Sequence, residues 1–117
     1  TDSTASIADL RAMIDAFVAE RDWSQFHAPK NLSMALAIEA AELMEHFQWL
    51  TTEEATNLAR AEEPTRQAIV DELADVLIYC ISLADVLDCD IGQIVLDKLA
   101  KAGDKYPIDK YYGNFGR

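Results

Sequence analysis

The chain has 117 residues, half of them apolar, and a formal net charge of −11. This length allows a single domain, residues 1–117, and the strong negative charge argues against electrostatic binding to the backbone of DNA or RNA. A phosphate-bearing small molecule is still compatible, because a divalent cation can lie between carboxylates and phosphates. Glycine and proline are scarce, which predicts an all-α fold.

The compartment is indicated by the start of the chain, by its apolar runs and by its two cysteines. Residues 1–4 are polar and lack a basic start, so no signal peptide is expected. The apolar run over residues 76–87 is too short to span a bilayer. Cys80 and Cys89 lie on and just after this apolar helix, where reduced thiols are expected rather than a disulfide. A soluble, cytoplasmic protein with no membrane association follows.

The first helix is expected from Ser6, which with Asp9 resembles a capping box, to the vicinity of residues 21–22. The following loop, residues 23–30, is rich in ring side chains: Trp23, Phe26 and His27. Aromatic side chains on a loop can serve a ligand, and they can equally close the end of a helical bundle. The loop alone leaves both readings open.

Two helices should follow this loop. The second helix is expected over residues 31–49. Thr51 and Glu54 then form a capping box for a short extra helix that ends near residue 61.

Two longer helices and a tail complete the chain. The fourth helix is expected over residues 64–87, and it is apolar on nearly every side from residue 76, which indicates burial between subunits. Asp90 with Gln93 caps the fifth helix, which ends near Gly103. The tail, residues 106–117, is expected to be extended.

Two short acidic repeats dominate the pattern. Glu39 and Glu42 stand three residues apart, as do Glu72 and Asp75, so each pair lies on one face of its helix. On a helical wheel, at about 100° per residue, these acids fall beside apolar rows. Carboxylates are rarely buried without a partner, so four acids directed inward from two helices predict a bound cation. The competing interpretation is that some of the four only flank the core on a solvated face.

The type of metal follows from the ligand atoms. Ligation by oxygen alone suits Mg²⁺, with Mn²⁺ as a possible substitute. Zinc sites require histidine or cysteine at ligand spacing, which the sequence lacks. A di-iron bundle needs a Glu-x-x-His on each of two helices, and neither His27 nor His46 stands three residues after a Glu.

The acidic repeats and several separate motifs resemble the all-α nucleoside triphosphate pyrophosphohydrolases, the MazG-like family. The stretches Arg21-Asp22-Trp23-x-Gln25-Phe26-His27, Phe47-Gln48-Trp49, Asp75-Val76-Leu77-Ile78-Tyr79 and Lys98 through Tyr106-Pro107 are closest to the dCTP pyrophosphatase branch. The resemblance implies a four-helix-bundle-type fold that assembles as a homotetramer, a dimer of dimers. It implies Mg²⁺-dependent hydrolysis of a (deoxy)nucleoside triphosphate, dCTP or a related or modified nucleotide, to the monophosphate and pyrophosphate.

The same resemblance assigns roles to individual residues. It implies Glu39, Glu42, Glu72 and Asp75 as metal ligands and catalytic residues. The substrate-binding residues that it implies are Trp23, His27, Asn31, Trp49, Tyr79 and Lys98. Glu45 also matches an acid of that branch and is a candidate to orient the metal ligands or to activate a water molecule. His46 is not carried over from the family; on the helical wheel it lies between Glu39 and Glu42, as a polar neighbour.

Two positions depart from the pattern of this branch. Ile14 replaces a histidine near the pocket, and Ala102 replaces an asparagine in the lysine-rich stretch, so base preference is left open. An alternative of another class is a non-catalytic helical module that oligomerises or binds a partner through the apolar fourth helix.

Overall fold

The computed structural model describes residues 1–61 and 64–115, and these residues form helices and turns without strands. The elements, in chain order, are α1 (Ile7–Glu20), the short 3-10 helix η1 (Ser24–Phe26), α2 (Pro29–Glu45), α3 (Thr52–Ala59), α4 (Thr65–Val86), α5 (Ile91–Lys105) and α6 (Ile108–Tyr111). The all-α prediction is therefore confirmed, and the bounds of α1, α3, α4 and α5 lie within about two residues of those expected.

The predicted helix caps are present because each depends only on residues close in sequence. The Ser6 hydroxyl accepts a hydrogen bond from the Asp9 backbone N–H at 3.1 Å, and the Asp9 carboxylate accepts one from the Ser6 N–H at 3.0 Å. Thr51 and Glu54 make the same reciprocal pair at the start of α3. Asp90 accepts from the backbone N–H of Gln93 at 2.8 Å. These bonds satisfy N–H groups that a helix start would otherwise leave without a partner.

One predicted bound is wrong. The second helix was expected over residues 31–49, and α2 begins within two residues of this start, at Pro29, but ends at Glu45. Proline suits the first position of a helix because no hydrogen bond from its nitrogen is needed there. At the other end, the backbone N–H groups of Phe47 and Gln48 both donate to the Met44 carbonyl, which closes the chain into a turn.

The tail also differs from the extended chain that was expected. Its first part forms α6, which begins directly after Pro107, whose own φ of −59° is compatible with a helix start. The Tyr106 and Tyr111 rings pack edge to face, with their centroids 5.0 Å apart. Residues 116 and 117 of the predicted tail lie outside the described residues.

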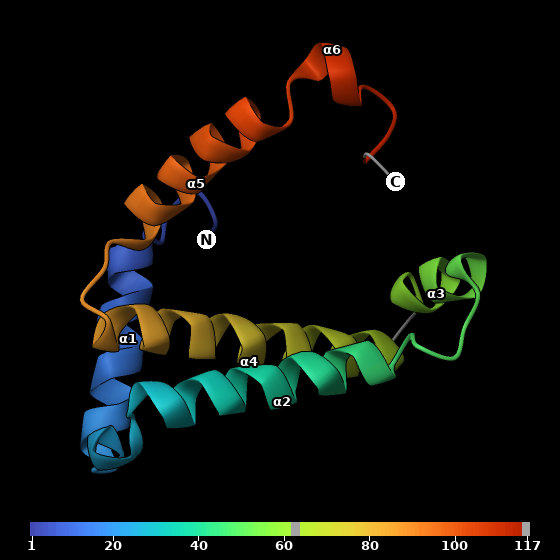
Figure 1. Ribbon diagram of the computed structural model, residues 1–117. Helices are drawn as coiled ribbons and strands as arrows, with labels where there is room; N and C mark the ends of the chain where they lie inside the picture. Colours follow the sequence, from blue (N-terminus) through green and yellow to red (C-terminus); the bar gives the residue numbers. More distant parts are fainter. Residues whose placement is uncertain (62–63, 116–117) are drawn as a thin grey trace.

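One helix pair organises the arrangement. α2 and α4 run side by side along most of their length, α1 crosses one end of the pair, and α3 lies at the other end (Figure 1). α5 and α6 lead away from the pair, so the chain by itself does not close into a four-helix bundle (Figure 1).

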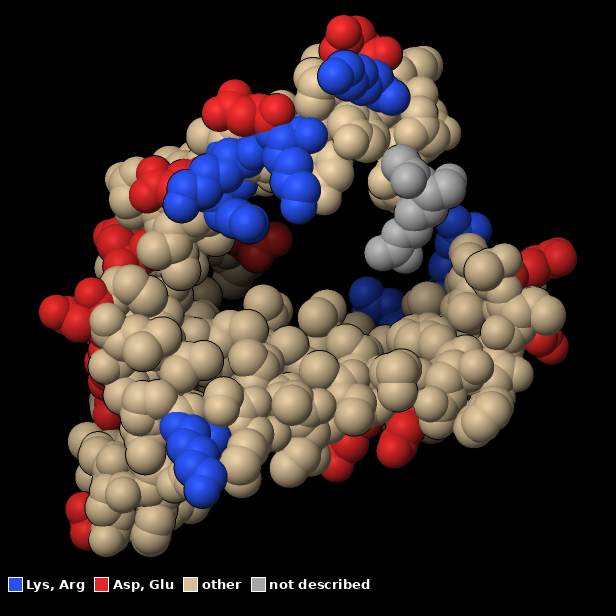
Figure 2. Space-filling view, in the orientation of Figure 1, with Lys and Arg blue, Asp and Glu red and all other residues tan. Residues whose placement is uncertain are grey.

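The core within one chain is small. Among the described residues, Leu32, Ser82 and Ala84 are buried, whereas many large apolar side chains of α1, α4 and α5 are exposed. The accessible surface is 9255 Å², against about 6,300 Å² for a compact monomer of 13.0 kDa. The radius of gyration is 17.4 Å, against about 13 Å for a compact domain of this length. Figure 2 shows the hollow that α5 and α6 leave above the α2–α4 pair.

Neither a membrane span nor a disulfide is found in the described part of the chain. Its helices do not combine the length and apolar character needed to cross a bilayer. The thiols of Cys80 and Cys89 are both free, and the Cys89 sulfur donates to the Ala84 carbonyl at 3.5 Å.

We expect the α2–α4 contact to depend on Leu32, which is only 2% exposed. Leu32→Ala should lower the free energy of unfolding by about 2–4 kcal/mol, because it removes buried methyl groups and leaves a cavity. Leu32→Met, which keeps the volume, should cost less than about 1.5 kcal/mol. Urea denaturation of the two variants checks this, and equal losses would contradict it.

Candidate functional site

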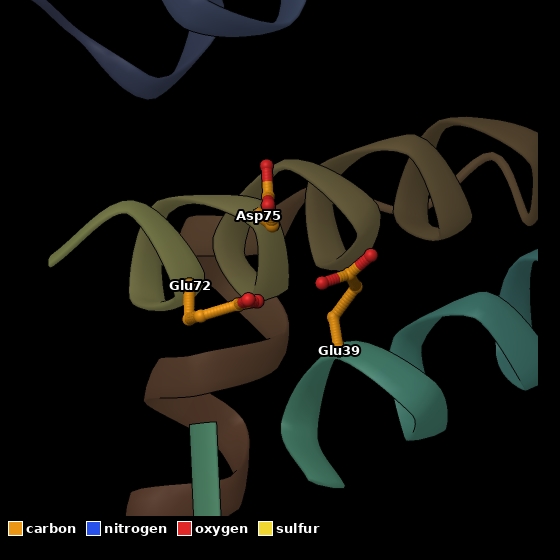
Figure 3. Close-up of side chains that lie close together, drawn as sticks. All are labelled: Glu39, Glu72 and Asp75. Atoms are coloured by element: carbon orange, nitrogen blue, oxygen red, sulfur yellow. The ribbon is translucent and has the colours of Figure 1, made fainter. Parts of the chain in front are cut away.

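Three of the four acids singled out in the sequence come together between α2 and α4. Glu39 extends from α2, while Glu72 and Asp75 extend from α4, one helical turn apart (Figure 3). One carboxylate oxygen of each residue lies within 4.8 Å of the others. Glu39 and Glu72 are half-buried and Asp75 is exposed, so the cluster opens to solvent on the side of Asp75.

Two oxygens of this cluster have no partner. Glu39 Oε2 and Glu72 Oε2 are buried, and when both carboxylates are ionised no described residue donates a hydrogen bond to either oxygen. A buried carboxylate oxygen without a partner is costly, and two that face each other also repel. A divalent cation would remove both costs, and three carboxylates with an open side match the oxygen ligands and retained waters that Mg²⁺ prefers. The donor set therefore fits such an ion.

The pKa of Glu39 reflects the same repulsion and burial. Its pKa is raised to about 7, first because a hydrogen bond to the Glu72 carboxyl group favours the protonated form. Burial raises the pKa further, as do the hydrogen bond and the negative charge of Glu42 and the charge of Glu72. A cation bound at this cluster would compete with the proton of Glu39.

The remaining acids of α2 differ in their positions. Glu42 lies close enough to Glu39 to raise its pKa, yet it is not part of the three-residue cluster. Glu45 is the exposed last residue of α2, also outside the cluster. The His46 ring packs edge to face on Phe47, with centroids 6.4 Å apart. Ligation by Glu42 and the expected roles of Glu45 and His46 stay predictions.

A cavity of about 250 Å³ lies one helical turn from the cluster. It is lined by Trp23, Phe26, His27, Asn31, Leu32, Ala35 and Tyr79. Ala35 precedes Glu39 by four residues on α2, and Tyr79 follows Asp75 by four on α4, so the two helices carry the cavity and the carboxylates on a shared face. Four of the six predicted substrate-binding residues thus line one cavity, which is called the aromatic cavity below.

The chain turn after α1 places Trp23 in this cavity. Asp22 adopts the left-handed conformation, with φ of 54°, which aspartate tolerates better than most residues. The backbone N–H of Trp23 donates to the Val18 carbonyl and that of Asp22 donates to Ala19, the hydrogen-bond pattern of a Schellman motif. The Trp23 ring then packs edge to face on Phe17, with centroids 5.8 Å apart.

The other end of the loop is held by Asn31. Its side-chain amide donates to the Phe26 carbonyl at 3.1 Å, which ties the loop to the first turn of α2. Both ends of the aromatic loop are therefore fixed by local hydrogen bonds, and the binding of a ligand by its rings stays a prediction.

Trp49 and Lys98 do not line the aromatic cavity of the same chain. Trp49 lies in the turn after α2 and is 86% exposed. Lys98 belongs to α5, which leads away from the α2–α4 pair (Figure 1). Basic side chains gather on α5 beside the hollow (Figure 2), and the lysines of this helix are Lys98, Lys101 and Lys105.

A second cluster of charged side chains, between α1 and α4, was not predicted from the sequence. Arg11 and Asp15 of α1 meet Asp85 of α4, where Arg11 Nε lies 3.4 Å from an Asp85 oxygen. The one available signal was Asp85 itself, an acid that interrupts the apolar run over residues 76–87. Its partners are far away in sequence, so the pattern of a single helix could not reveal them.

Comparison with known proteins gives consistent matches. The MazG-like family model matches residues 34–114. The chain is 42% identical over 106 residues to "dCTP pyrophosphatase 1" from Bos taurus, covering 91% of this chain and 62% of that protein. It is 41% identical over 102 residues to the Homo sapiens protein of the same name, covering 87% and 59%. The chain thus spans about three fifths of the length of these relatives.

A solved structure agrees with the sequence matches. A pyrophosphatase from Archaeoglobus fulgidus superposes with a TM-score of 0.79 at 35% identity, covering 86% of this chain and 91% of that one. With the family match extending over most of its length, the chain belongs to the MazG-like family.

The raised pKa of Glu39 predicts how the metal-free protein responds to pH. A carboxyl group with a pKa of about 7 in the folded state, against about 4.5 when unfolded, binds more protons when folded between these values. Its contribution to stability is therefore present below about pH 4.5 and is lost as the pH rises through 7. In the presence of a chelator, the melting temperature of the native chain should decrease from about pH 5 to about pH 8. The decrease should be smaller in Glu39→Gln, which lacks the titrating carboxyl group.

Added Mg²⁺ should raise the melting temperature more at about pH 8 than at pH 5, because binding competes with the proton. Identical pH profiles for the native chain and Glu39→Gln would show that Glu39 does not titrate in this range.

Proposed function

We propose that the chain is a Mg²⁺-dependent nucleotide pyrophosphohydrolase. It converts a (deoxy)nucleoside triphosphate, dCTP or a related or modified nucleotide, to the monophosphate and pyrophosphate. Such an activity removes unwanted nucleotides from the cytoplasmic pool, a compartment with which the two free thiols are compatible. The names of the relatives, dCTP pyrophosphatase 1, support this choice of substrate.

One observation carries the proposal. The buried, unbonded oxygens of Glu39 and Glu72 lie one helical turn from a cavity lined by aromatic rings. Carboxylates that need a cation suit the triphosphate of a nucleotide, and exposed ring faces suit its base. A structural role for either feature alone would not require the two to be adjacent.

The residues divide into two groups by chemistry. Glu39, Glu42, Glu72 and Asp75 would hold the ion, which supplies positive charge to the phosphoryl oxygens as the anhydride is cleaved. Because Asp75 is the exposed member of the cluster, the phosphates would approach from its side. A carboxylate that does not hold the ion can accept a proton from the attacking water.

The base and sugar would occupy the aromatic cavity. The Trp23 indole and the Tyr79 phenol offer ring faces for stacking, and His27 and Asn31 offer polar atoms for the sugar and base. Tyr79 follows Asp75 by one turn, so a base held there keeps its phosphates beside the carboxylates. Trp49 and Lys98 would complete the site from another copy of the chain.

Assembly as a homotetramer, a dimer of dimers, accounts for the open shape of one chain. The accessible surface exceeds that of a compact monomer by about 2,900 Å². An excess of this size is comparable to the area that obligate oligomers bury. The exposed apolar residues of α4 and α5, such as Leu77, Leu96 and Leu99, would then be covered.

The alternative is a helical module that assembles without catalysis, which the exposed apolar faces also favour. A module of this kind gives no reason for unbonded carboxylate oxygens beside an aromatic cavity. Release of pyrophosphate from a nucleotide distinguishes the enzyme from the non-catalytic module.

We expect the purified protein with Mg²⁺ to release pyrophosphate from at least one deoxynucleoside triphosphate, with dCTP the best of the four. Asp75→Asn should lower turnover by at least about 100-fold while leaving helicity unchanged, because it removes a metal ligand. The matched control is Asp71→Asn on the same helix, whose carboxylate accepts from Gln67 at 2.7 Å.

The assay follows pyrophosphate and identifies the nucleotide product by chromatography. The absence of release from all four nucleotides, in a folded and metal-loaded sample, would rule the activity out.

Trp49→Ala should act mainly on binding. Loss of one stacking ring costs about 1–3 kcal/mol, so KM should rise about 5-fold or more while kcat changes little. Steady-state kinetics with the best nucleotide measures both constants. Unchanged KM and unchanged base preference would exclude Trp49 from the pocket.

A further inference from the structure

A second cavity, of about 430 Å³, lies between α1 and α4 and is more polar than the aromatic cavity. His27 lines both cavities, so they adjoin at this ring. The other polar residues of the second cavity are Asp15, Ser24, Ser82 and Asp85. Its volume falls within the ~300–1,000 Å³ typical of small-molecule sites. We call it the polar cavity.

Two carboxyl groups form one wall of this cavity. Arg11 is fixed by a 2.7 Å hydrogen bond from its Nη2 to the Cys89 carbonyl, and its Nε lies 3.4 Å from an Asp85 oxygen. Arg11 thereby holds the Asp85 carboxylate in place. Burial, a hydrogen bond to Asp85 and the charge of Asp85 raise the pKa of Asp15, and the charge of Arg11 opposes this.

The carboxyl groups of Asp15 and Asp85 therefore lie side by side on this wall. The lone pairs that remain on the two groups are hydrogen-bond acceptors available to the cavity.

Ser82 provides an independent sign that a ligand belongs here. The residue is only 5% exposed, yet it lines the polar cavity. Unlike Ser33 and Thr56, whose hydroxyls donate to backbone carbonyls of their own helices, Ser82 makes no side-chain hydrogen bond to any described residue. The Ser82 hydroxyl therefore remains available for a hydrogen bond to a ligand in the cavity.

The position of the cavity along α4 relates it to the proposed nucleotide site. Asp75, Tyr79, Ser82 and Val86 follow at intervals of four, three and four residues, so they form one stripe along the helix. At about 1.5 Å per residue, Ser82 lies about 10 Å along the axis from Asp75. This separation resembles that between the α-phosphate of an extended nucleotide and the far edge of its base.

We propose that the polar cavity binds the edge of the nucleobase, that Asp15 and Asp85 select an exocyclic amino group over a carbonyl oxygen, and that Ser82 adds a hydrogen bond to either group. The inference rests on the proposed function, because it assumes that the phosphates lie at Glu39, Glu72 and Asp75. An amino group donates to the acceptors of the carboxyl pair. A carbonyl oxygen in the same place would face other acceptors and leave them without a donor.

The test compares dCMP with dUMP, which differ at the base edge by an amino group against a carbonyl oxygen. Both are monophosphates, so binding is measured by calorimetry without turnover. The native chain should bind dCMP about 10-fold or more tightly than dUMP, the discrimination expected of hydrogen bonds to charged groups. Asp15→Asn should lower this ratio by about 5-fold or more, mainly because dCMP binds more weakly. Ser82→Ala should weaken the binding of both nucleotides, because a hydroxyl can accept from an amino group or donate to a carbonyl oxygen.

The matched control is Glu20→Gln, which removes an exposed carboxylate from the same helix as Asp15. It should leave the ratio unchanged. Asp85 is not substituted, because its loss would also release Arg11.

Three results would overturn the inference: equal affinity for dCMP and dUMP, no binding of either, or an unchanged ratio in Asp15→Asn. If the native chain still releases pyrophosphate from nucleotides, only the assignment of the polar cavity fails. If it releases none, the proposed function fails as well, so the two failures are distinct.

Discussion

Two glutamates that face each other across the α2–α4 contact set the main constraint on this molecule. One oxygen of Glu39 and one of Glu72 are buried without a hydrogen bond, between the two helices that contact each other most extensively. Repulsion and desolvation here work against the packing of Leu32 a few turns away. A fold that keeps such a contact needs a positive partner for it, which the described side chains do not supply. The candidate site and its function follow from this requirement.

The open shape of the chain is the second feature that function has to explain. α5 carries its lysines away from the carboxylates of its own chain, and large apolar side chains of α4 and α5 face solvent. Proteins of this size seldom expose so much apolar surface without a partner. Assembly of copies would bury this surface and bring basic side chains toward the acids. A single chain without a cation thus leaves two requirements unmet: neutralisation of the carboxylates and coverage of the apolar surface.

Much of the fold could be predicted from sequence because it is local. The caps at Ser6, Thr51 and Asp90 depend on side chains that bond to backbone three residues away, and they were predicted correctly. The end of α2 was not, because no glycine or proline marks the turn after Glu45. α6, in the tail, was not predicted either, because four residues carry too little periodicity to indicate a helix.

The site shows the same division between local and distant information. The spacing within each acidic repeat predicted which carboxylates share a face, and three of the four meet in the structure. The convergence of Trp23, His27, Asn31 and Tyr79 was implied by the family resemblance, because spacing cannot bring a loop onto a distant helix. The pairing of Asp15 with Asp85 had no sequence signal beyond an acid inside an apolar run. Such contacts are visible only when helices are placed in space.

The most direct test of the metal centre is a crystal grown with Mn²⁺ in place of Mg²⁺, with anomalous scattering recorded at the manganese edge. The carboxylate constraint predicts an anomalous peak between α2 and α4, within coordination distance of oxygens of Glu39, Glu72 and Asp75. A fully exchanged crystal with no peak there, or with its peaks only at other acids, would contradict the central claim.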